Sequence, residues 1–143
     1  MNTHDMPPVA ISVLLADDDE EDLELFQAAV TKVNSTAKVK TVLNGRLALE
    51  YLQQCRDKEL PCLIILDYNM PEMNGVDLLD RLRPDERFKN IPKLILSTSN
   101  AQSHVRECLD HGAANYFVKP NNMRDLEALA ADMLTYCTTS QDL

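Results

Sequence analysis

The segment that most constrains the fold is residues 63–75, with the sequence LIILDYNMPEMNG. It starts with four consecutive aliphatic residues, without polar alternation, and these lead directly into Asp67. Such a run predicts a strand that is buried on both faces, as in a parallel sheet covered by helices. Asp67 would then lie at the carboxyl end of the strand, where ligands collect in open α/β sheets. This stretch alone leaves a second interpretation open, in which Asp67 only opens a turn or caps the next helix.

The rest of the chain alternates short apolar segments with segments of helical periodicity. Strands are expected at residues 11–16, 37–42, 62–66, 93–97 and 115–118. Helices are expected from residue 22 onward and at residues 45–55, 75–82, 101–111 and about 123–136. Gly112 is suited to the left-handed position that ends the fourth of these helices. Strict alternation with short connections predicts an α/β fold with a doubly wound parallel sheet and right-handed crossovers.

Length and charge restrict the classes of function. A chain of 143 residues suits one domain, since domains commonly have about 100–150 residues. Its net charge of −9 argues against nucleic-acid binding and favours cations or basic partners. No apolar run approaches the ~20 residues that span a bilayer, and the start, MNTHDMPP, lacks a hydrophobic signal core. The sequence therefore predicts a cytoplasmic protein without a membrane segment.

The four cysteines show neither a CxxC pair nor the spacing of a zinc site. They are Cys55, Cys62, Cys108 and Cys137. We expect them to be buried or surface thiols in a reducing compartment rather than disulfides or metal ligands.

An acidic block, residues 17–22, follows the first predicted strand. The carboxylates of residues 19–22 are explained as helix caps and first-turn charges. Asp17 and Asp18 are explained less well, because two carboxylates at a strand end repel each other unless a cation or a lysine lies between them. We therefore expect a positive charge, from a bound cation or from a lysine elsewhere in the chain, to lie beside these two carboxylates.

Polar residues also end the later strands, with Ser97 after the fourth and Lys119 after the fifth. Because all strand carboxyl ends open on one edge of a doubly wound sheet, we expect a common crevice there. Three carboxylates without histidine or thiolate suit a hard divalent cation such as Mg²⁺. Lysine and serine suit anionic oxygens, as phosphoryl transfer requires, and an aspartate can itself be the nucleophile.

This ordered set resembles the receiver domain of two-component response regulators, from about residue 11 to residue 136. The matching residues are Asp17–Asp18, Asp67 with Asn69, Met70, Pro71 and Gly75, Ser97–Thr98, Tyr116 and Lys119–Pro120. The resemblance implies a flavodoxin-like (βα)₅ fold with strand order 2-1-3-4-5. It also implies a receiver domain at residues 10–137, between a flexible leader at 1–9 and a polar tail at 138–143.

The resemblance further implies roles for the residues around Asp67, which would accept a phosphoryl group from a phosphohistidine. Asp18, Asp67 and the backbone carbonyl of Asn69 would bind Mg²⁺, or alternatively Mn²⁺, and Asp17 would hold it partly through water. Asn69 and Ser99 occupy the two positions that tune the lifetime of the phosphate in this family.

The fourth and fifth strand ends would bind the phosphate and switch the domain. The residues implied are Ser97, Thr98, Lys119 and the aromatic switch residue Tyr116. The Lys119–Pro120 bond resembles the family's cis peptide, a geometry that is accessible before proline.

By resemblance, the chain would be a single-domain response regulator that catalyses only its own phosphorylation and dephosphorylation. Its partner would be a sensor histidine kinase or a histidine phosphotransfer protein. Residues 83–99, RPDERFKNIPKLILSTS, are similar to the subgroup that partners phytochrome-type kinases. Output would pass through the fourth helix, fifth strand and fifth helix, by docking or homodimerisation.

Two other classes of function share part of this pattern. A haloacid-dehalogenase-type phosphatase also forms an aspartyl phosphate with Mg²⁺, but it needs a second aspartate two residues after the nucleophile, where Asn69 stands. An interaction module with a dead site should have lost some acidic or lysine positions, and none is missing.

Overall fold

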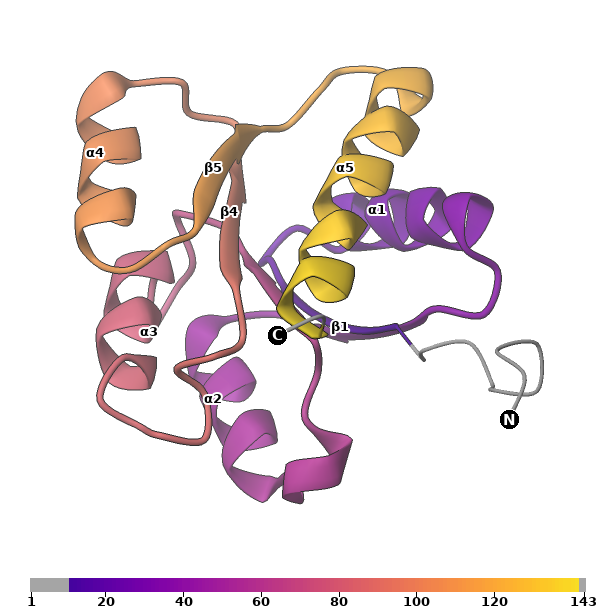
Figure 1. The fold of residues 1–143 in the computed structure, drawn as a ribbon. Coiled ribbons are helices and arrows are strands. Elements are labelled where there is room, and N and C mark those ends of the chain that lie inside the picture. The colour runs from indigo at the N-terminus through magenta and orange to yellow at the C-terminus, as the bar shows by residue number, and fades with distance from the viewer. Residues whose placement is uncertain (1–10, 142–143) are drawn as a thin grey trace, which may run out of the picture.

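The computed structural model describes residues 11–141, with side chains described up to residue 137. The chain forms one five-stranded parallel sheet with the order β2-β1-β3-β4-β5, as predicted (Figure 1). The strands are β1 Ser12–Ala16, β2 Lys38–Val42, β3 Leu63–Leu66, β4 Lys93–Ser97 and β5 Asn115–Val118. The helices are α1 Glu20–Val33, α2 Gly45–Gln54, the 3₁₀ helix η2 Asp57–Glu59, α3 Gly75–Leu82, α4 Gln102–Asp110 and α5 Met123–Gln141. The doubly wound, flavodoxin-like fold is thereby confirmed.

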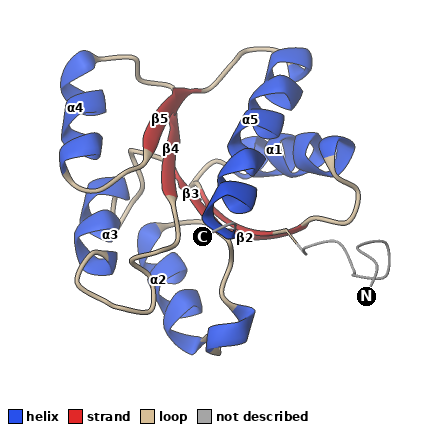
Figure 2. Cartoon of the chain, viewed as in Figure 1, coloured by secondary structure: helices blue, strands red, loops and turns tan. Residues whose placement is uncertain are grey.

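Helices cover both faces of the sheet (Figure 2). α1 and α5 pack on one face around Phe26 and Met133, whereas α2, α3 and α4 pack on the other around Leu52 and Leu78. All four residues of β3 are buried, with alternate side chains entering the two cores. Burial on both faces is the physical reason why this strand shows no polar alternation in the sequence.

Local capping sets the helix boundaries. The Asp19 side chain accepts hydrogen bonds from the backbone N–H groups of Glu21 and Asp22, so α1 begins at Glu20 rather than at residue 22. Gly112 has a φ of +108°, which confirms the predicted left-handed end of α4.

The end of the chain differs from the prediction. α5 runs to Gln141, so residues 138–141 are helical although we predicted helix only to about 136 and a polar tail from 138. No glycine or proline occurs between residues 123 and 141 to stop the helix. The predicted leader at residues 1–9 lies outside the described residues.

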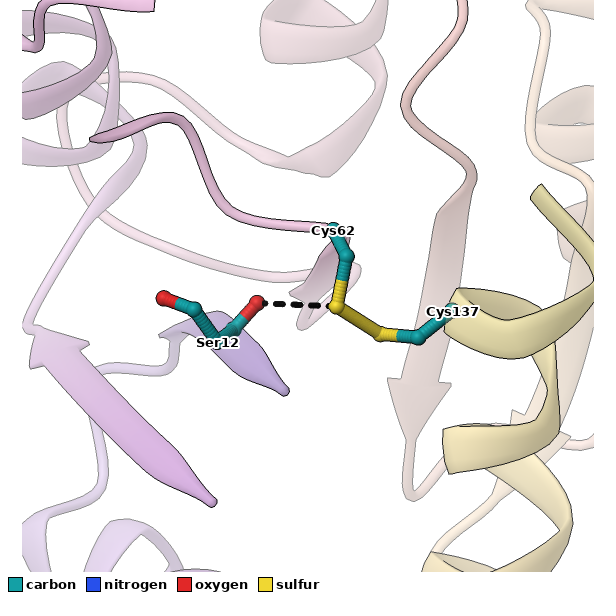
Figure 3. The surroundings of a disulfide bond; sticks show 3 residues. All are labelled: Ser12, Cys62 and Cys137. Atoms are coloured by element: carbon teal, nitrogen blue, oxygen red, sulfur yellow. Dashed lines mark hydrogen bonds between the residues drawn. A yellow bond between two sulfur atoms is a disulfide. The ribbon is translucent and has the colours of Figure 1, made fainter. Parts of the chain in front are cut away.

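A disulfide joins Cys62, just before β3, to Cys137 in α5, and Figure 3 shows it beside the Ser12 carbonyl. The prediction of four thiols was therefore wrong for this pair. The two cysteines lie 75 residues apart in sequence, yet their Cα atoms are 5.1 Å apart. Rules based on cysteine spacing identify only pairs that are close in sequence. They cannot detect a pair that is brought together by the packing of α5 on the sheet.

The other two cysteines, Cys55 and Cys108, are free thiols, as predicted. Burial raises the pKa of the Cys108 thiol to about 11, which keeps it protonated at neutral pH. Among residues 11–141, no helix combines the length and the apolar composition that crossing a bilayer requires.

Lys93, the first residue of β4, is a buried cation at the edge of the sheet opposite to Asp67. Lys93 is 7% exposed, and its Nζ donates a hydrogen bond to the carbonyl oxygen of Phe88. Burial lowers the pKa of Lys93 from 10.5 to about 8. Between these two pH values the unfolded chain binds more protons than the folded one, so this residue makes the free energy of unfolding rise with pH.

We expect Lys93→Met to remove this rise, because methionine does not titrate. The free energy of unfolding of the wild type, measured by urea titration, should increase relative to that of the variant by on the order of 2 kcal/mol from pH 8 to pH 10. Lys89→Met is the control, since the Lys89 side chain is 53% exposed and pairs with Glu86. Parallel pH profiles for the wild type and the Lys93 variant would contradict the prediction.

Candidate functional site

The acidic residues predicted to meet at the carboxyl edge of the sheet do meet there. β1 and β3 are neighbouring strands, and Ala16 pairs with Leu66. The residues that follow them, Asp17 and Asp67, therefore lie side by side. The backbone N–H of Asp67 donates to the Ala16 carbonyl at 3.0 Å. Carboxylate oxygens of Asp17, Asp18 and Asp67 lie within 4.8 Å of one another. The ends of β1 and β3 thus form a cluster of three carboxylates.

Lys119 brings a cation into this cluster from the end of β5. Its backbone N–H donates to the Ser97 carbonyl at 2.8 Å, which fixes the strand end beside β4. Its Nζ lies 2.6 Å from Asp17 Oδ2, 2.8 Å from Asp22 Oδ2 and 3.3 Å from Asp67 Oδ2. All three donors of the ammonium group therefore have a carboxylate within reach.

The electrostatics of the site follow from its burial and its excess of negative charge. Burial raises the pKa of Asp17 to about 6, although the hydrogen bond from Lys119 acts in the opposite direction. Burial disfavours the Lys119 ammonium, but its hydrogen bonds to Asp17 and Asp22 outweigh this effect and raise its pKa. Three carboxylates contact the Lys119 ammonium group, and Asp18 adds a fourth negative charge to the site. The cluster of Asp17, Asp18 and Asp67 is an all-oxygen, negatively charged donor set that fits a hard divalent cation.

The segment after β4 supplies the predicted hydroxyl groups. Ser97 is buried, and its Oγ accepts a hydrogen bond from the Ser99 backbone N–H at 3.3 Å. Thr98 is exposed. The Ser99 hydroxyl lies 2.6 Å from His104 Nδ1 and accepts from the backbone of Ala101. The loop between β4 and α4 is thus tied to the first turn of α4.

Tyr116 is half-buried in β5, and its hydroxyl donates to the Ser99 carbonyl at 2.7 Å. It therefore contacts the same loop as Ser97. The Lys119–Pro120 peptide bond is not cis in this structure, so the cis prediction was wrong. Trans is favoured before proline by about 0.5–1 kcal/mol, and the dipeptide itself contains nothing that reverses this preference.

Two contacts of α4 were not predicted, and both involve Tyr68, the residue after Asp67. Its hydroxyl donates to the Glu107 carboxylate, which raises the pKa of Tyr68 to about 12. Its ring stacks on His104 with a centroid distance of 4.3 Å. His104 and Glu107 are three residues apart and so share one face of α4, a spacing that is visible in the sequence only once a partner is known.

The turn after Asp67 depends on Gly75. The Gly75 backbone N–H donates to the Tyr68 carbonyl at 3.1 Å, and a Cβ atom at this position would lie 2.5 Å from the Asp67 carbonyl oxygen. Only glycine permits this approach. Asn69 lies in the same loop with an exposed side chain.

Asp22 is a further residue of the site that the sequence did not reveal. We assigned it to the first turn of α1, where an acidic residue needs no other explanation. The acidic block itself was the visible signal, but the ion pair of Asp22 with Lys119 joins residues 97 positions apart.

Comparisons with known proteins agree with this arrangement. The family model of the response regulator receiver domain matches residues 13–131. The chain is 35% identical over 129 residues to the two-component response regulator ORR3 of Oryza sativa subsp. indica, covering 90% of this chain and 95% of ORR3.

Two solved structures share the fold over most of their length. The phosphorylated cyanobacterial phytochrome response regulator RcpA is 27% identical, with a TM-score of 0.82 and coverage of 92% of this chain and 96% of RcpA. The Mn²⁺-bound response regulator Rcp1 is 26% identical, with a TM-score of 0.74 and coverage of 85% and 90%. The chain therefore belongs to the family of response regulator receiver domains.

Proposed function

We propose that this receiver domain accepts a phosphoryl group on Asp67 from the phosphohistidine of a sensor histidine kinase. The observation that carries the proposal is the meeting of Asp17, Asp18 and Asp67 at one edge of the sheet, with the Lys119 ammonium group against Asp17 and Asp67. The Asp67 carboxylate attacks phosphorus, an O–P bond forms, the N–P bond of the phosphohistidine breaks, and the imidazole leaves.

The residues around Asp67 act mainly by holding charge. Asp17, Asp18, Asp67 and the Asn69 carbonyl would hold Mg²⁺ or Mn²⁺, which would neutralise charge on the phosphoryl oxygens when bound. The Mn²⁺-bound state of Rcp1 supports this metal assignment by analogy. Lys119 provides a second positive charge for the same oxygens.

Phosphorylation adds about −1.5 to −2 charges, and Ser97 and Lys119 are the neighbouring groups that would respond to it. We propose that Ser97 turns toward the phosphate, with Thr98 in the same loop, and that this loop passes the change on. Its Ser99 carbonyl accepts the Tyr116 hydroxyl, which provides a direct connection to β5. The α4–β5–α5 surface is then the output surface, for a target protein or a second copy of the chain, and Asn69 and Ser99 set the lifetime of the phosphate.

We further propose a cytoplasmic location and a phytochrome-type kinase as partner. The phytochrome response regulator RcpA supports the kinase class. The receiver family, which works with histidine kinases, and the net charge of −9 both fit a protein partner better than a nucleic acid.

The proposal is tested by incubating the chain with a small phosphodonor, such as phosphoramidate, and following its intact mass. With Mg²⁺ we expect uptake of one phosphoryl group, and with an excess of chelator we expect none, because three carboxylates then repel the incoming phosphoryl group. Catalytic turnover of p-nitrophenyl phosphate would instead favour the phosphatase. Absence of labelling with both donor and kinase would favour an interaction module.

A further inference from the structure

Asp22 contacts the site without belonging to its carboxylate cluster. It lies in the first turn of α1, its side chain is 34% exposed, and its Oδ2 is 2.8 Å from Lys119 Nζ. The cluster that could hold a cation consists of the other three carboxylates. Asp22 and Lys119 also line one pocket together with Pro120, so their contact forms part of the wall beside the site.

The three partners of the Lys119 ammonium differ in what a divalent cation does to them. Two of them, Asp17 and Asp67, are proposed ligands of the cation, and they share their charge with it when it binds. The cation also repels the ammonium directly, because like charges a few ångströms apart disfavour each other. Asp22 is the partner that a cation at the cluster leaves in place.

We propose that Asp22 is a positioning residue that holds the Lys119 ammonium group beside the site when Asp17 and Asp67 bind a cation. Lys119 then stays within reach of the phosphoryl group on Asp67 instead of swinging into solvent. The inference rests on the proposed function, since it assigns a cation to the carboxylate cluster.

A second explanation of Asp22 is that it only stabilises the N-terminus of α1. Glu21 separates the two explanations, because it lies in the same helical turn and carries the same charge, yet it is exposed and its backbone is capped by Asp19 in the same way. A helix-terminal effect should appear equally in Glu21→Gln and Asp22→Asn. An effect through Lys119 should appear only in Asp22→Asn.

The test is a double-mutant cycle of Mg²⁺ affinity, measured by calorimetry on unphosphorylated protein. We expect Asp22→Asn to weaken Mg²⁺ binding about tenfold, because Lys119 is then left with only the two carboxylates that the cation needs. In a Lys119→Met background the same substitution should change the affinity about twofold or less, since no ammonium remains to be held. Lys119→Gln replaces the methionine variant if that variant does not fold.

A second readout is the rate of phosphorylation by phosphoramidate at saturating Mg²⁺. We expect a decrease of about tenfold in Asp22→Asn, partial recovery in Asp22→Glu and the wild-type rate in Glu21→Gln. Equal effects of Asp22→Asn in both Lys119 backgrounds, or a loss matched by Glu21→Gln, would overturn the inference and leave the proposed function standing. Wild-type protein that binds Mg²⁺ but takes up no phosphoryl group would instead refute the proposed function.

Discussion

Asp67→Asn is expected to take up no phosphoryl group from phosphoramidate or from a cognate histidine kinase. An amide nitrogen or oxygen is not a competent nucleophile toward phosphorus under these conditions, whereas the carboxylate is. The substitution keeps the size of the side chain, so the 3.3 Å contact with Lys119 can persist as a hydrogen bond to the amide oxygen. Intact-mass spectrometry after incubation with donor and Mg²⁺ measures the effect.

Asp132→Asn is the matched control for this variant. Asp132 is an exposed aspartate of α5 and lies outside the carboxylate cluster, so the loss of its charge should leave labelling unchanged. Persistent labelling of Asp67→Asn would move the phosphoacceptor to a neighbouring carboxylate, of which Asp17 and Asp18 are the candidates within 4.8 Å.

The carboxylate cluster was predictable because it depends on topology rather than on side-chain detail. Once the four aliphatic residues before Asp67 indicate a strand buried on both faces, the parallel sheet follows, and all strand carboxyl ends share one edge. Asp17 and Lys119 could therefore be placed at the same edge of the sheet as Asp67, because each of them follows the carboxyl end of a strand. The distances place the Lys119 ammonium group against Asp17 and Asp67, so a lysine is one of the two partners expected to offset the repulsion at this strand end.

The role of Asp22 could not be predicted, because it depends on a side-chain contact and not on the topology of the sheet. An acidic residue in the first turn of a helix is already explained by its favourable interaction with the helix dipole. The local sequence therefore gives no indication of a further ion-pair partner. The contact depends on the path of the chain between β5 and α5, which brings Lys119 over the first turn of α1. The isomer of the Lys119–Pro120 bond is likewise not encoded by the dipeptide.

The disulfide could not be predicted either, because it also depends on how distant segments of the chain pack. Cys62 precedes β3 and Cys137 lies in α5, and the two meet only because α5 packs against the face of the sheet that carries Leu63 and Ile65. The sequence predicted that α5 has an apolar face. It did not predict how far the helix continues or that it would reach Cys62, just before β3.

Loss of the Cys62–Cys137 bond is expected to lower the free energy of unfolding by about 4 kcal/mol, because the bond closes a long loop in the unfolded chain. The sequence separation of 75 residues places it toward the upper part of the usual range for disulfides. Urea unfolding with and without a reductant, and of the Cys62→Ser/Cys137→Ser double variant, measures the effect. Cys55→Ser is the control, since Cys55 is a free and partly exposed thiol.

Equal unfolding midpoints for oxidised and reduced protein would contradict this prediction. The bond lies at the amino end of β3, whereas Asp67 follows the carboxyl end, so reduction should change stability with little effect on the rate of phosphorylation. A parallel loss of both properties would mean that α5 holds the site as well as the fold.

The same experiment in glutathione buffers tests the expected cytoplasmic location. Disulfides are rare in reducing compartments, so a cytoplasmic protein should contain this bond only if it resists reduction by a glutathione pool. If the bond is reduced at cytoplasmic glutathione ratios, the stability of the dithiol form is the relevant one in the cell. The Cys62–Cys137 bond would then form only under oxidising conditions, and its contribution to the free energy of unfolding would be confined to those conditions.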